Sequence, residues 1–357
     1  MITARERQAS LTKPAGSLGQ LETIAEQFAA WQDVQKPALD SIIIRVFAAD
    51  HGVCAQNVSA FPQSVTQQMV SNFLNGGAAI SVLSDASKAD FAVVNMGLTA
   101  AIPDTVLSQH RQRLINIDLA PGTADFSQHS AMTEAQMQKS LAAGQQVIEQ
   151  AIQQASQQTM SETVPHLFIG GEMGIGNTSA ASAIYCTLLD ISPTLAVGPG
   201  TGIDTAGVQH KANIIQQALD VHAQTLASAP HGSSDNALNA LRTVGGLDIA
   251  GLVGAYIAAA QQGIPSLVDG FICTAAALVA TTINPSVRDW LLFAHQSAEP
   301  AHVLALQSLN AQPLLNIGMR LGEGSGAAVA LPLLQSAVLL HNNMATFAEA
   351  SVAQAQT

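Results

Sequence analysis

Short apolar runs alternate with helical segments along the 357 residues of this chain. The runs occupy residues 42–47, 90–95, 114–119, 166–169 and 264–268, and each is followed by glycines or a turn. Short apolar strands that alternate with helices are typical of a mostly parallel sheet covered by helices on both faces. The pattern therefore predicts a doubly wound α/β fold, in which ligands bind beyond the carboxyl ends of the strands.

Four segments outside these runs have helical character. Residues 63–75 carry apolar positions at helical spacing and end at a Gly-Gly pair. Residues 133–155 are polar, Gln-rich and rich in alanine, which predicts a solvent-facing helix. Residues 245–262 and 271–282 are apolar on nearly every side, so we expect two buried helices there.

Both ends of the chain are also predicted to be helical. The head has a helical pattern around residues 21–31, and the tail from about residue 333 to 355 is predicted to form a helical pair. We expect the two ends to pack together. The predicted organisation is a large Rossmann-like domain over 32–332 and a small helical domain built from 1–31 and 333–357.

Composition narrows the possible partners. Hydrophobic residues make up 48% of the chain and charged residues only 11%, with a formal net charge of −12. An acidic chain without a Lys/Arg-rich stripe repels a phosphate backbone, which argues against nucleic-acid binding. An anionic small substrate would need a local site made of backbone N–H groups, helix N-termini and a single cation.

Cysteine usage and the apolar segments predict a cytoplasmic protein. Cys54, Cys186 and Cys273 are odd in number, widely spaced and set in apolar contexts, so we expect buried reduced thiols. No Cys/His spacing indicates a metal site. The first residues contain no apolar core of a secretory signal, and the longest apolar stretches are interrupted by polar residues. We therefore expect buried helices and no membrane span.

The first candidate for chemistry is the glycine-rich segment 170–179, GGEMGIGNTS, which contains Glu172, Gly174, Gly176, Asn177 and Thr178. It follows a predicted strand and opens a helix, so its backbone can approach a ligand and offer N–H groups to an anion. It matches neither a Walker A loop nor GxGxxG. The alternative is a plain strand-to-helix turn capped by Asn177 or Thr178.

A second glycine-rich segment, GPGTGID over 198–204, contains Gly202 and Asp204 and is followed by Lys211. Lys211 is one of very few cations in the middle of the chain, so it could supply the charge that a phosphate needs. A solvated helix lysine is the alternative.

The third candidate is Glu323, which lies between glycines in LGEGSGAA (321–328) at the start of a long apolar helix. A carboxylate there is costly unless it is paired, or unless its pKa is raised so that it can exchange protons near neutrality. The alternative is a helix-capping or first-turn carboxylate.

Other polar residues are less specific. Asp50 and His51 follow the first predicted strand and suit a capping Asp beside a hydrogen-bonded His. The two histidines of segment 295–302 lack zinc-protease spacing, so structural hydrogen bonding is expected for both. Asp248 lies within an apolar helix and needs a buried partner, which the sequence does not name.

Taken together, seven motifs in this order resemble the nicotinate-nucleotide:dimethylbenzimidazole phosphoribosyltransferase family, the CobT family of cobalamin nucleotide-loop assembly. They are KPAGSLGQLE (13–22), FAADHGV (47–53), GEMGIGNT (171–178), GTGID (200–204), VDGFI (268–272), SAEPAH (297–302) and LGEGSGAA (321–328). The resemblance runs from about residue 12 to 340. Two departures are a short segment before residue 13, which predicts either a trimmed small domain or a misassigned start codon, and Ala301 where the family suggests glycine.

The resemblance implies a homodimer and a reaction. Nicotinate mononucleotide and 5,6-dimethylbenzimidazole would give α-ribazole 5′-phosphate and nicotinate, without a metal or other cofactor. Glu323 resembles the family's base and Glu172 its second active-site carboxylate. Expected contacts to the phosphate or nucleotide are Gly174, Gly202, Lys211 and Ser297, with Gly176, Asn177, Thr178 and Asp204 from the same motifs; Ser64 and Leu321 are expected near the aromatic base.

The chemistry of these substrates fits such residues. The nicotinate ring of the nucleotide is a pyridinium, which departs without a general acid, whereas the incoming benzimidazole must lose its ring N–H to a base. A carboxylate near an oxocarbenium-like transition state would stabilise it. Two other classes remain alternatives: a nucleotide-dependent oxidoreductase, against which the missing GxGxxG stands, and a non-catalytic heterocycle-binding module.

Overall fold

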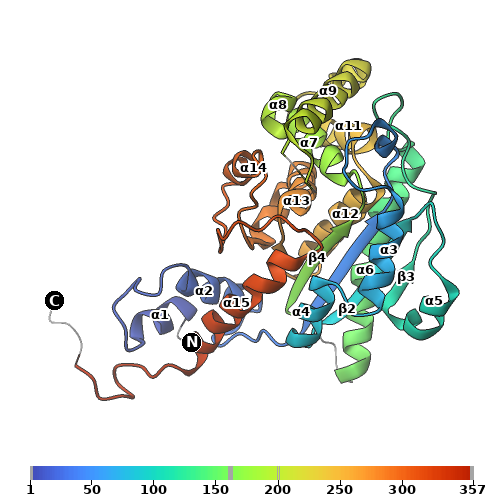
Figure 1. Ribbon diagram of the computed structural model, residues 1–357. Coiled ribbons are helices and arrows are strands. Elements are labelled where there is room, and N and C mark those ends of the chain that lie inside the picture. Colours follow the sequence, from blue (N-terminus) through green and yellow to red (C-terminus); the bar gives the residue numbers. More distant parts are fainter. Residues whose placement is uncertain (1–2, 160–163, 199, 201, 354–357) are drawn as a thin grey trace.

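The computed structural model describes residues 3–159, 164–198, 200 and 202–353. Its centre is one parallel sheet of six strands in the order β3-β2-β1-β4-β5-β6. Figure 1 labels β2, β3 and β4 of this sheet. The strands are β1 (Ile42–Ala49), β2 (Asp90–Gly97), β3 (Leu114–Asn116), β4 (Leu167–Met173), β5 (Ser266–Val268) and β6 (Leu291–Phe293). This is the strand order of doubly wound dinucleotide-binding folds, and it reverses between β1 and β4. The predicted fold class is confirmed.

Helices cover both faces because successive strand residues point to opposite sides. In β1, Ile43 and Phe47 join one core, and Ile44 and Val46 join the other. The first core is completed by α6 (Glu134–Thr159), α7 (Asn177–Leu189), α8 (Pro193–Ala196), α9 (Thr205–Val221), α11 (Ser234–Val244), α12 (Leu247–Gln261), α13 (Phe271–Ile283) and α14 (His302–Ser308). The second is completed by α2 (Gln20–Trp31), α3 (Ser64–Leu74), α4 (Ala79–Ser87) and α15 (Ser325–Asn343), with α5 (Asp104–His110) packed beside it.

The remaining elements are short. They are α1 (Ala4–Ser10), α10 (Ala223–Leu226) and the 3₁₀ turns η1 (Gly52–Gln56), η2 (Arg111–Arg113) and η3 (Pro285–Trp290). Within the described ranges, no helix is long and apolar enough to cross a lipid bilayer.

All five predicted strands are confirmed, and the structure adds β6, whose three residues are too few to stand out as an apolar run. The helix expected over 133–155 exists as α6, but the expectation of a solvent-facing helix is wrong for one of its sides. That side packs along α12 and buries Met137, Val147 and Ile148. The two helices can approach closely because Gly144 has no side chain, and a Cβ there would collide with the α12 backbone.

The two ends of the chain do pack together, as expected. Figure 1 shows α1 and α2 beside the C-terminal part of α15, at one end of the molecule. Leu11 pairs with Thr346 in an antiparallel bridge, and the Arg7 guanidinium donates to the His341 carbonyl over 2.8 Å. The predicted helical pair in the tail is wrong, because one helix runs from Ser325 to Asn343 and only turns follow it up to residue 351; residues 354–357 lie outside the described range.

Candidate active site

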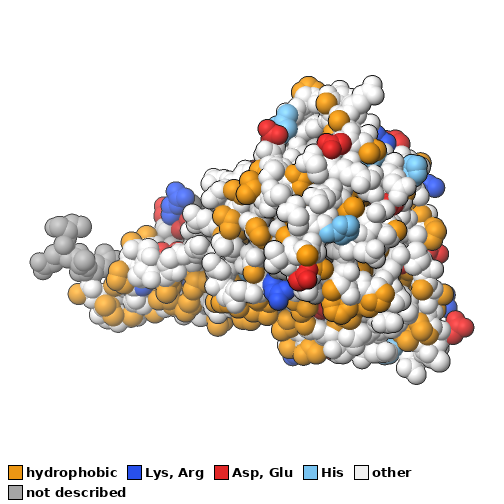
Figure 2. Space-filling model, turned by 45° about the horizontal axis from the view of Figure 1, so that its top comes forward, with side chains coloured by type: hydrophobic (Ala, Val, Ile, Leu, Met, Phe, Trp, Pro, Cys, Tyr) orange, Lys and Arg blue, Asp and Glu red, His pale blue; other side chains and the backbone are white. Residues whose placement is uncertain are grey.

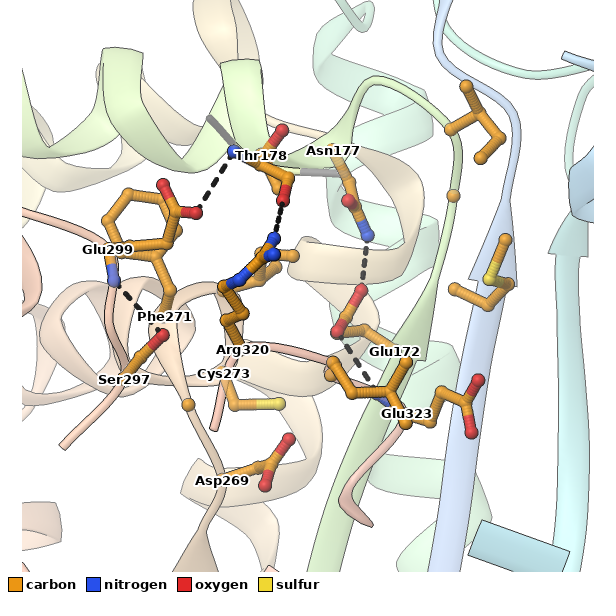
Figure 3. Close-up of a pocket in the computed structure, with 18 of the residues that line it drawn as sticks. Glu172, Asn177, Thr178, Asp269, Phe271, Cys273, Ser297, Glu299, Arg320 and Glu323 are labelled. Carbon is orange, nitrogen blue, oxygen red and sulfur yellow. Dashed lines mark hydrogen bonds between the residues drawn. The ribbon is translucent and has the colours of Figure 1, made fainter. Parts of the chain in front are cut away.

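A cavity of about 300 Å³ opens at the carboxyl ends of the central strands. Its lining comes from the turn after β4, the turn after β5, the segment after β6, the loop before α15 and one side of α3. Figure 3 shows Glu172 and Glu323 toward one side of it and Ser297 and Glu299 toward the other. This is the edge of the sheet where doubly wound folds bind ligands, next to the reversal of strand order.

Glu323 lies on a loop with an unusual backbone. Gly322, Glu323 and Gly324 have φ values of 89°, 68° and 87°, so three successive residues are left-handed, and only the flanking glycines adopt this without strain. Asp269, just after β5, holds the loop: its carboxylate accepts from the Gly324 N–H over 3.2 Å and from the Ala327 N–H over 2.8 Å. Asp269 therefore caps α15 and fixes the loop that presents Glu323.

The Glu323 carboxylate does not cap its own helix. The residue that directly precedes α15 is Gly324, and the Glu323 side chain instead meets the N–H of Ile80 in the first turn of α4. Its Oε2 has no hydrogen-bond partner among the described residues. Burial, followed by the nearby Asp269 carboxylate, raises the pKa of Glu323 to about 7, while the Ile80 N–H opposes the shift. Such a group can take up or release a proton near neutrality.

Glu172 is the second buried carboxyl group and lies near the end of β4. Its Oε2 accepts from the amide of Asn177, and its Oε1 accepts from the backbone N–H of Glu323 over 3.3 Å (Figure 3). Burial raises its pKa to about 8, and the carboxylates of Asp248 and Asp269 contribute to the rise. The group therefore holds a proton more strongly than an ordinary glutamate.

The turn after β4 does not use its polar side chains as helix caps. Gly176, with φ 97°, precedes α7 without a side-chain cap. The Asn177 amide faces Glu172, and the Thr178 hydroxyl accepts from Lys211 over 2.7 Å. The Ile175 N–H donates to the Thr66 hydroxyl of α3 over 3.0 Å. The simple capped turn considered as an alternative is therefore not what forms.

Lys211 is a buried cation and not a solvated surface lysine. Only 1% of it is exposed, on the inner side of α9. Burial lowers its pKa to about 8, and the carboxylate of Glu299 opposes that shift. Glu299 accepts from the Gly200 N–H over 3.0 Å, and Arg320 donates to the Gly200 carbonyl over 3.1 Å. These contacts hold the second glycine-rich loop beside the cavity; its Pro199 and Thr201 lie outside the described residues.

The side of the cavity formed by α3 is apolar. It is lined by Val65 and Met69 of α3, Phe61 before it, Met173 at the end of β4 and Ile175 in the turn that follows. Leu321 completes this wall from the Glu323 loop. A flat apolar ring would therefore meet hydrophobic side chains here and a carboxyl group at the edge.

The less specific polar residues are structural in part. His302 accepts from the Ser297 N–H over 2.7 Å and lies 2.9 Å from the Thr274 hydroxyl, and burial lowers its pKa to about 3. Asp50 accepts from the backbone and hydroxyl of Thr99. Ala301 has φ −72°, so the residue that departs from the family pattern is not strained.

The structure brings seven of the twelve residues singled out above to the cavity wall: Glu172, Gly174, Asn177, Thr178, Ser297, Leu321 and Glu323. Gly176 does not line the cavity and packs against Cys54 and His51, and Lys211 reaches the wall through Thr178. Gly202 does not line the cavity, and Asp204 caps α9 by accepting from the Gly207 N–H over 2.8 Å. Ser64 is exposed at the start of α3, where Val65 and Met69 line the wall instead. The substrate contacts of all these residues stay predictions.

Sequence reasoning missed several residues of the cavity. Asp269 follows a predicted strand, so its place at the carboxyl end of β5 was a usable signal. Arg320 directly precedes the motif over 321–328 and Glu299 lies inside the motif over 297–302, but nothing in their spacing indicated that both would contact Gly200. Within the described residues, no cluster of three or more His, Cys, Asp or Glu side chains is arranged to hold a metal ion.

Known proteins resemble this chain over its whole length. A family model described as phosphoribosyltransferase matches residues 1–352. A relative from Pseudomonas putida (strain W619), named nicotinate-nucleotide--dimethylbenzimidazole phosphoribosyltransferase, is 52% identical over 99% of this chain and 94% of its own. A relative of the same name from Pseudomonas fluorescens (strain SBW25) is 53% identical over 98% of this chain and 93% of its own.

A solved structure also matches. The crystal structure of CobT from Thermus thermophilus superimposes with a TM-score of 0.88 at 39% sequence identity, and the match covers 99% of this chain and 98% of that one. Sequence and fold therefore agree on the same group of proteins.

Proposed function

This chain belongs to the phosphoribosyltransferase family, and we propose that it transfers ribose 5-phosphate from nicotinate mononucleotide to 5,6-dimethylbenzimidazole. The products are nicotinate and α-ribazole 5′-phosphate. The names of the relatives support the reaction. The observation that carries the mechanism is the Glu323 carboxyl group, which is buried beside an apolar wall with an unpartnered oxygen and a pKa of about 7.

Glu323 acts as the general base. One ring nitrogen of the benzimidazole attacks C1′ of the ribose while the N–H of the other nitrogen gives its proton to the carboxylate. The electron pair of the C1′–nitrogen bond returns to the nicotinate ring, which leaves as a neutral pyridine, so no acid is needed on that side. Attack from the face opposite to the leaving group inverts C1′ and gives the α-linkage.

Glu172 stabilises positive charge at the ribose. Its buried carboxyl group is held by Asn177 and by the Glu323 N–H, so it needs no reorganisation during the reaction. A pyridinium or an oxocarbenium-like sugar beside it favours ionisation of this group, which burial and the carboxylates of Asp248 and Asp269 disfavour.

The phosphate end lies toward Lys211 and Arg320. Lys211 holds Thr178 at the start of α7, and Arg320 lines the cavity. A local pair of cations beside a helix N-terminus is what a phosphate requires in a chain of net charge −12. The side of the cavity that contains Ser297 and Glu299 faces this phosphate end as well (Figure 3).

The apolar wall of α3 supports a methylated aromatic base. The methyl groups of dimethylbenzimidazole would rest against Val65 and Met69, which bury them from water at about 25 cal/mol per Å² of apolar surface. A purine would bring ring nitrogens and an amine to the same side chains without hydrogen-bond partners.

The test is a product assay with Glu323→Gln. Nicotinate release in the presence of dimethylbenzimidazole, followed by chromatography, should fall by about 10²–10⁴-fold, while calorimetric affinity for the nucleotide changes little. Glu149→Gln, the same substitution on α6 and outside the cavity, is the control. Turnover of Glu323→Gln at the level of that control would exclude Glu323 as the base.

Three further features belong to the proposal. The chain acts as a homodimer through an apolar face that includes Val82 of α4 and Val329 and Leu339 of α15, which are exposed. Figure 2 shows a band of hydrophobic side chains along one edge of the molecule.

Residues 1–31 and 333–357 form a small helical domain, although α15 runs through this boundary without a break. The protein works in the cytoplasm, where its three unpaired cysteines stay reduced.

A further inference from the structure

His51 and Asp248 form a buried pair behind the cavity. Both side chains have no exposed surface, and His51 Nε2 lies 3.0 Å from Asp248 Oδ1. Neither atom has a hydrogen bond of good geometry to any described group. His51 follows β1, and Asp248 lies in the first turn of α12. A carboxylate so deeply buried is costly unless neighbouring groups compensate its charge.

The other oxygen of Asp248 points toward the active site. Its Oδ2 accepts from the Asn177 amide nitrogen over 3.3 Å, and the same nitrogen donates to Glu172 Oε2. One amide group with two hydrogens thus lies between two carboxyl groups. If Asp248 did not accept from it, the Asn177 side chain could rotate and present its oxygen to Glu172.

The backbone around this pair is built to fit it. A Cβ on Gly246 would collide with the His51 ring and with Asp248 Oδ1, and a Cβ on Gly174 would come within 3.0 Å of His51 Nε2. Gly174 belongs to the turn that lines the cavity. The His51 ring therefore supports this turn from behind, while Asp248 holds the Asn177 side chain.

We propose that Asp248, which is buried against the His51 ring, is a positioning residue of this active site and acts on Glu172 through the Asn177 amide. It keeps the amide nitrogen facing Glu172, and Glu172 in turn accepts from the N–H of Glu323. A residue that touches no substrate thereby places both carboxyl groups of the cavity.

Asp248 also acts on Glu172 by its charge. After burial, its carboxylate is the largest cause of the raised pKa of Glu172, so its removal should lower that pKa. The other titratable groups around Glu172 are Tyr256 of α12, Cys273 of α13, Asp269 after β5, and Glu323 before α15, with His51 behind Asp248 and His295 beyond Asp269. Asp248 is the one of these carboxylates that shares a donor with Glu172.

Two substitutions separate position from charge. Asp248→Asn keeps an oxygen that can accept from Asn177 but removes the charge. Asp248→Ala removes both. Asp90→Asn and Asp90→Ala are the controls, because Asp90 pairs with the buried Arg45 guanidinium and lies outside the cavity.

The first measurement does not depend on the proposed reaction. Infrared titration of the full-length protein follows the C=O band of the protonated Glu172 carboxyl group, assigned by its loss in Glu172→Gln. The midpoint should move to lower pH in both Asp248 variants and stay unchanged in both Asp90 variants. An unmoved midpoint in Asp248→Asn would overturn the electrostatic action of Asp248 on Glu172, even if Asp248→Ala failed to fold.

The second measurement is kinetic and rests on the proposed transfer. In Asp248→Ala, kcat for nicotinate release should fall at least tenfold with little change in KM for the nucleotide, and Asp248→Asn should recover a large part of kcat. A loss of thermal stability in Asp248→Ala with kcat equal to that of Asp90→Ala would leave Asp248 a structural residue only. Absence of transfer in the unmodified protein would instead overturn the proposed function and leave the titration result standing.

Discussion

The chemistry of this site depends on single carboxyl groups, because burial raises the pKa values of Glu323 and Glu172. Glu323 has an ordinary sequence context for a residue before a helix, and its glycine neighbours were the signal that set it apart. The sequence could indicate that this residue was special, since glycines on both sides allow left-handed backbone. It could not indicate Asp269 as the group that holds the loop, because the two hydrogen bonds join residues 55 and 58 positions apart.

The raised pKa of Glu323 gives activity and stability opposite dependences on pH. In the folded protein the group has a pKa of about 7, against a usual value of 4.5. The folded state therefore binds more protons than the unfolded state between these values, and its stability falls as pH rises through that window. Ionised Glu323 is the active base, so turnover should rise over the same window.

Glu323→Gln isolates this contribution, because the amide can still accept from the Ile80 N–H and has no charge to lose. The free energy of unfolding of the unmodified protein should fall between pH 5 and pH 8 by on the order of 1–3 kcal/mol more than that of the variant. Urea titrations at a series of pH values measure the difference. Parallel pH profiles for the two proteins would contradict a raised pKa for Glu323.

Elements of the fold were predictable where their signal was local. Five parallel strands were visible because strands buried on both faces are continuous apolar runs. Tertiary packing decided the rest. The predicted domain boundary lies at residue 332, yet α15 continues through it and contains Pro332, since Leu331 and Leu334 are buried on either side and hold the helix in place.

The loop before α15 offers a test at this scale. Gly322 has φ 89°, and a Cβ there would collide with Glu172 Oε1, whereas Gly318 has φ 77° and a Cβ there would meet nothing within 4 Å. Gly318→Ala should therefore cost about 1 kcal/mol of stability for the left-handed backbone and leave turnover unchanged.

Gly322→Ala should incur the same backbone cost and in addition displace Glu172, so that nicotinate release falls at least tenfold. Thermal unfolding and initial rates compare the two variants. Equal turnover in both would show that the close approach of Gly322 to Glu172 does not matter for the reaction.

The whole molecule combines an acidic, alanine-rich body with an arm made of both chain ends, in which α1 and α2 lie beside the C-terminal part of α15. The arm begins where α15 leaves the sheet, and α2 and α4 pack against that helix. Leu339 on α15 and Val82 on α4 remain 63% and 58% exposed. Apolar side chains in such numbers along one face favour burial against another protein surface, and the proposed occupant is a second copy of the chain.

Leu339→Glu tests this assembly. Light scattering after gel filtration should give the unmodified protein a mass of twice 36.9 kDa, and the variant should shift toward a single chain as it is diluted. The reason is that a carboxylate buried in an apolar contact loses its hydration without gaining a partner. Val221→Glu is the matched control, because Val221 is also exposed but ends α9, an element of the opposite core. A single-chain mass for the unmodified protein, or dissociation of both variants to the same degree, would contradict a dimer through the face of α15.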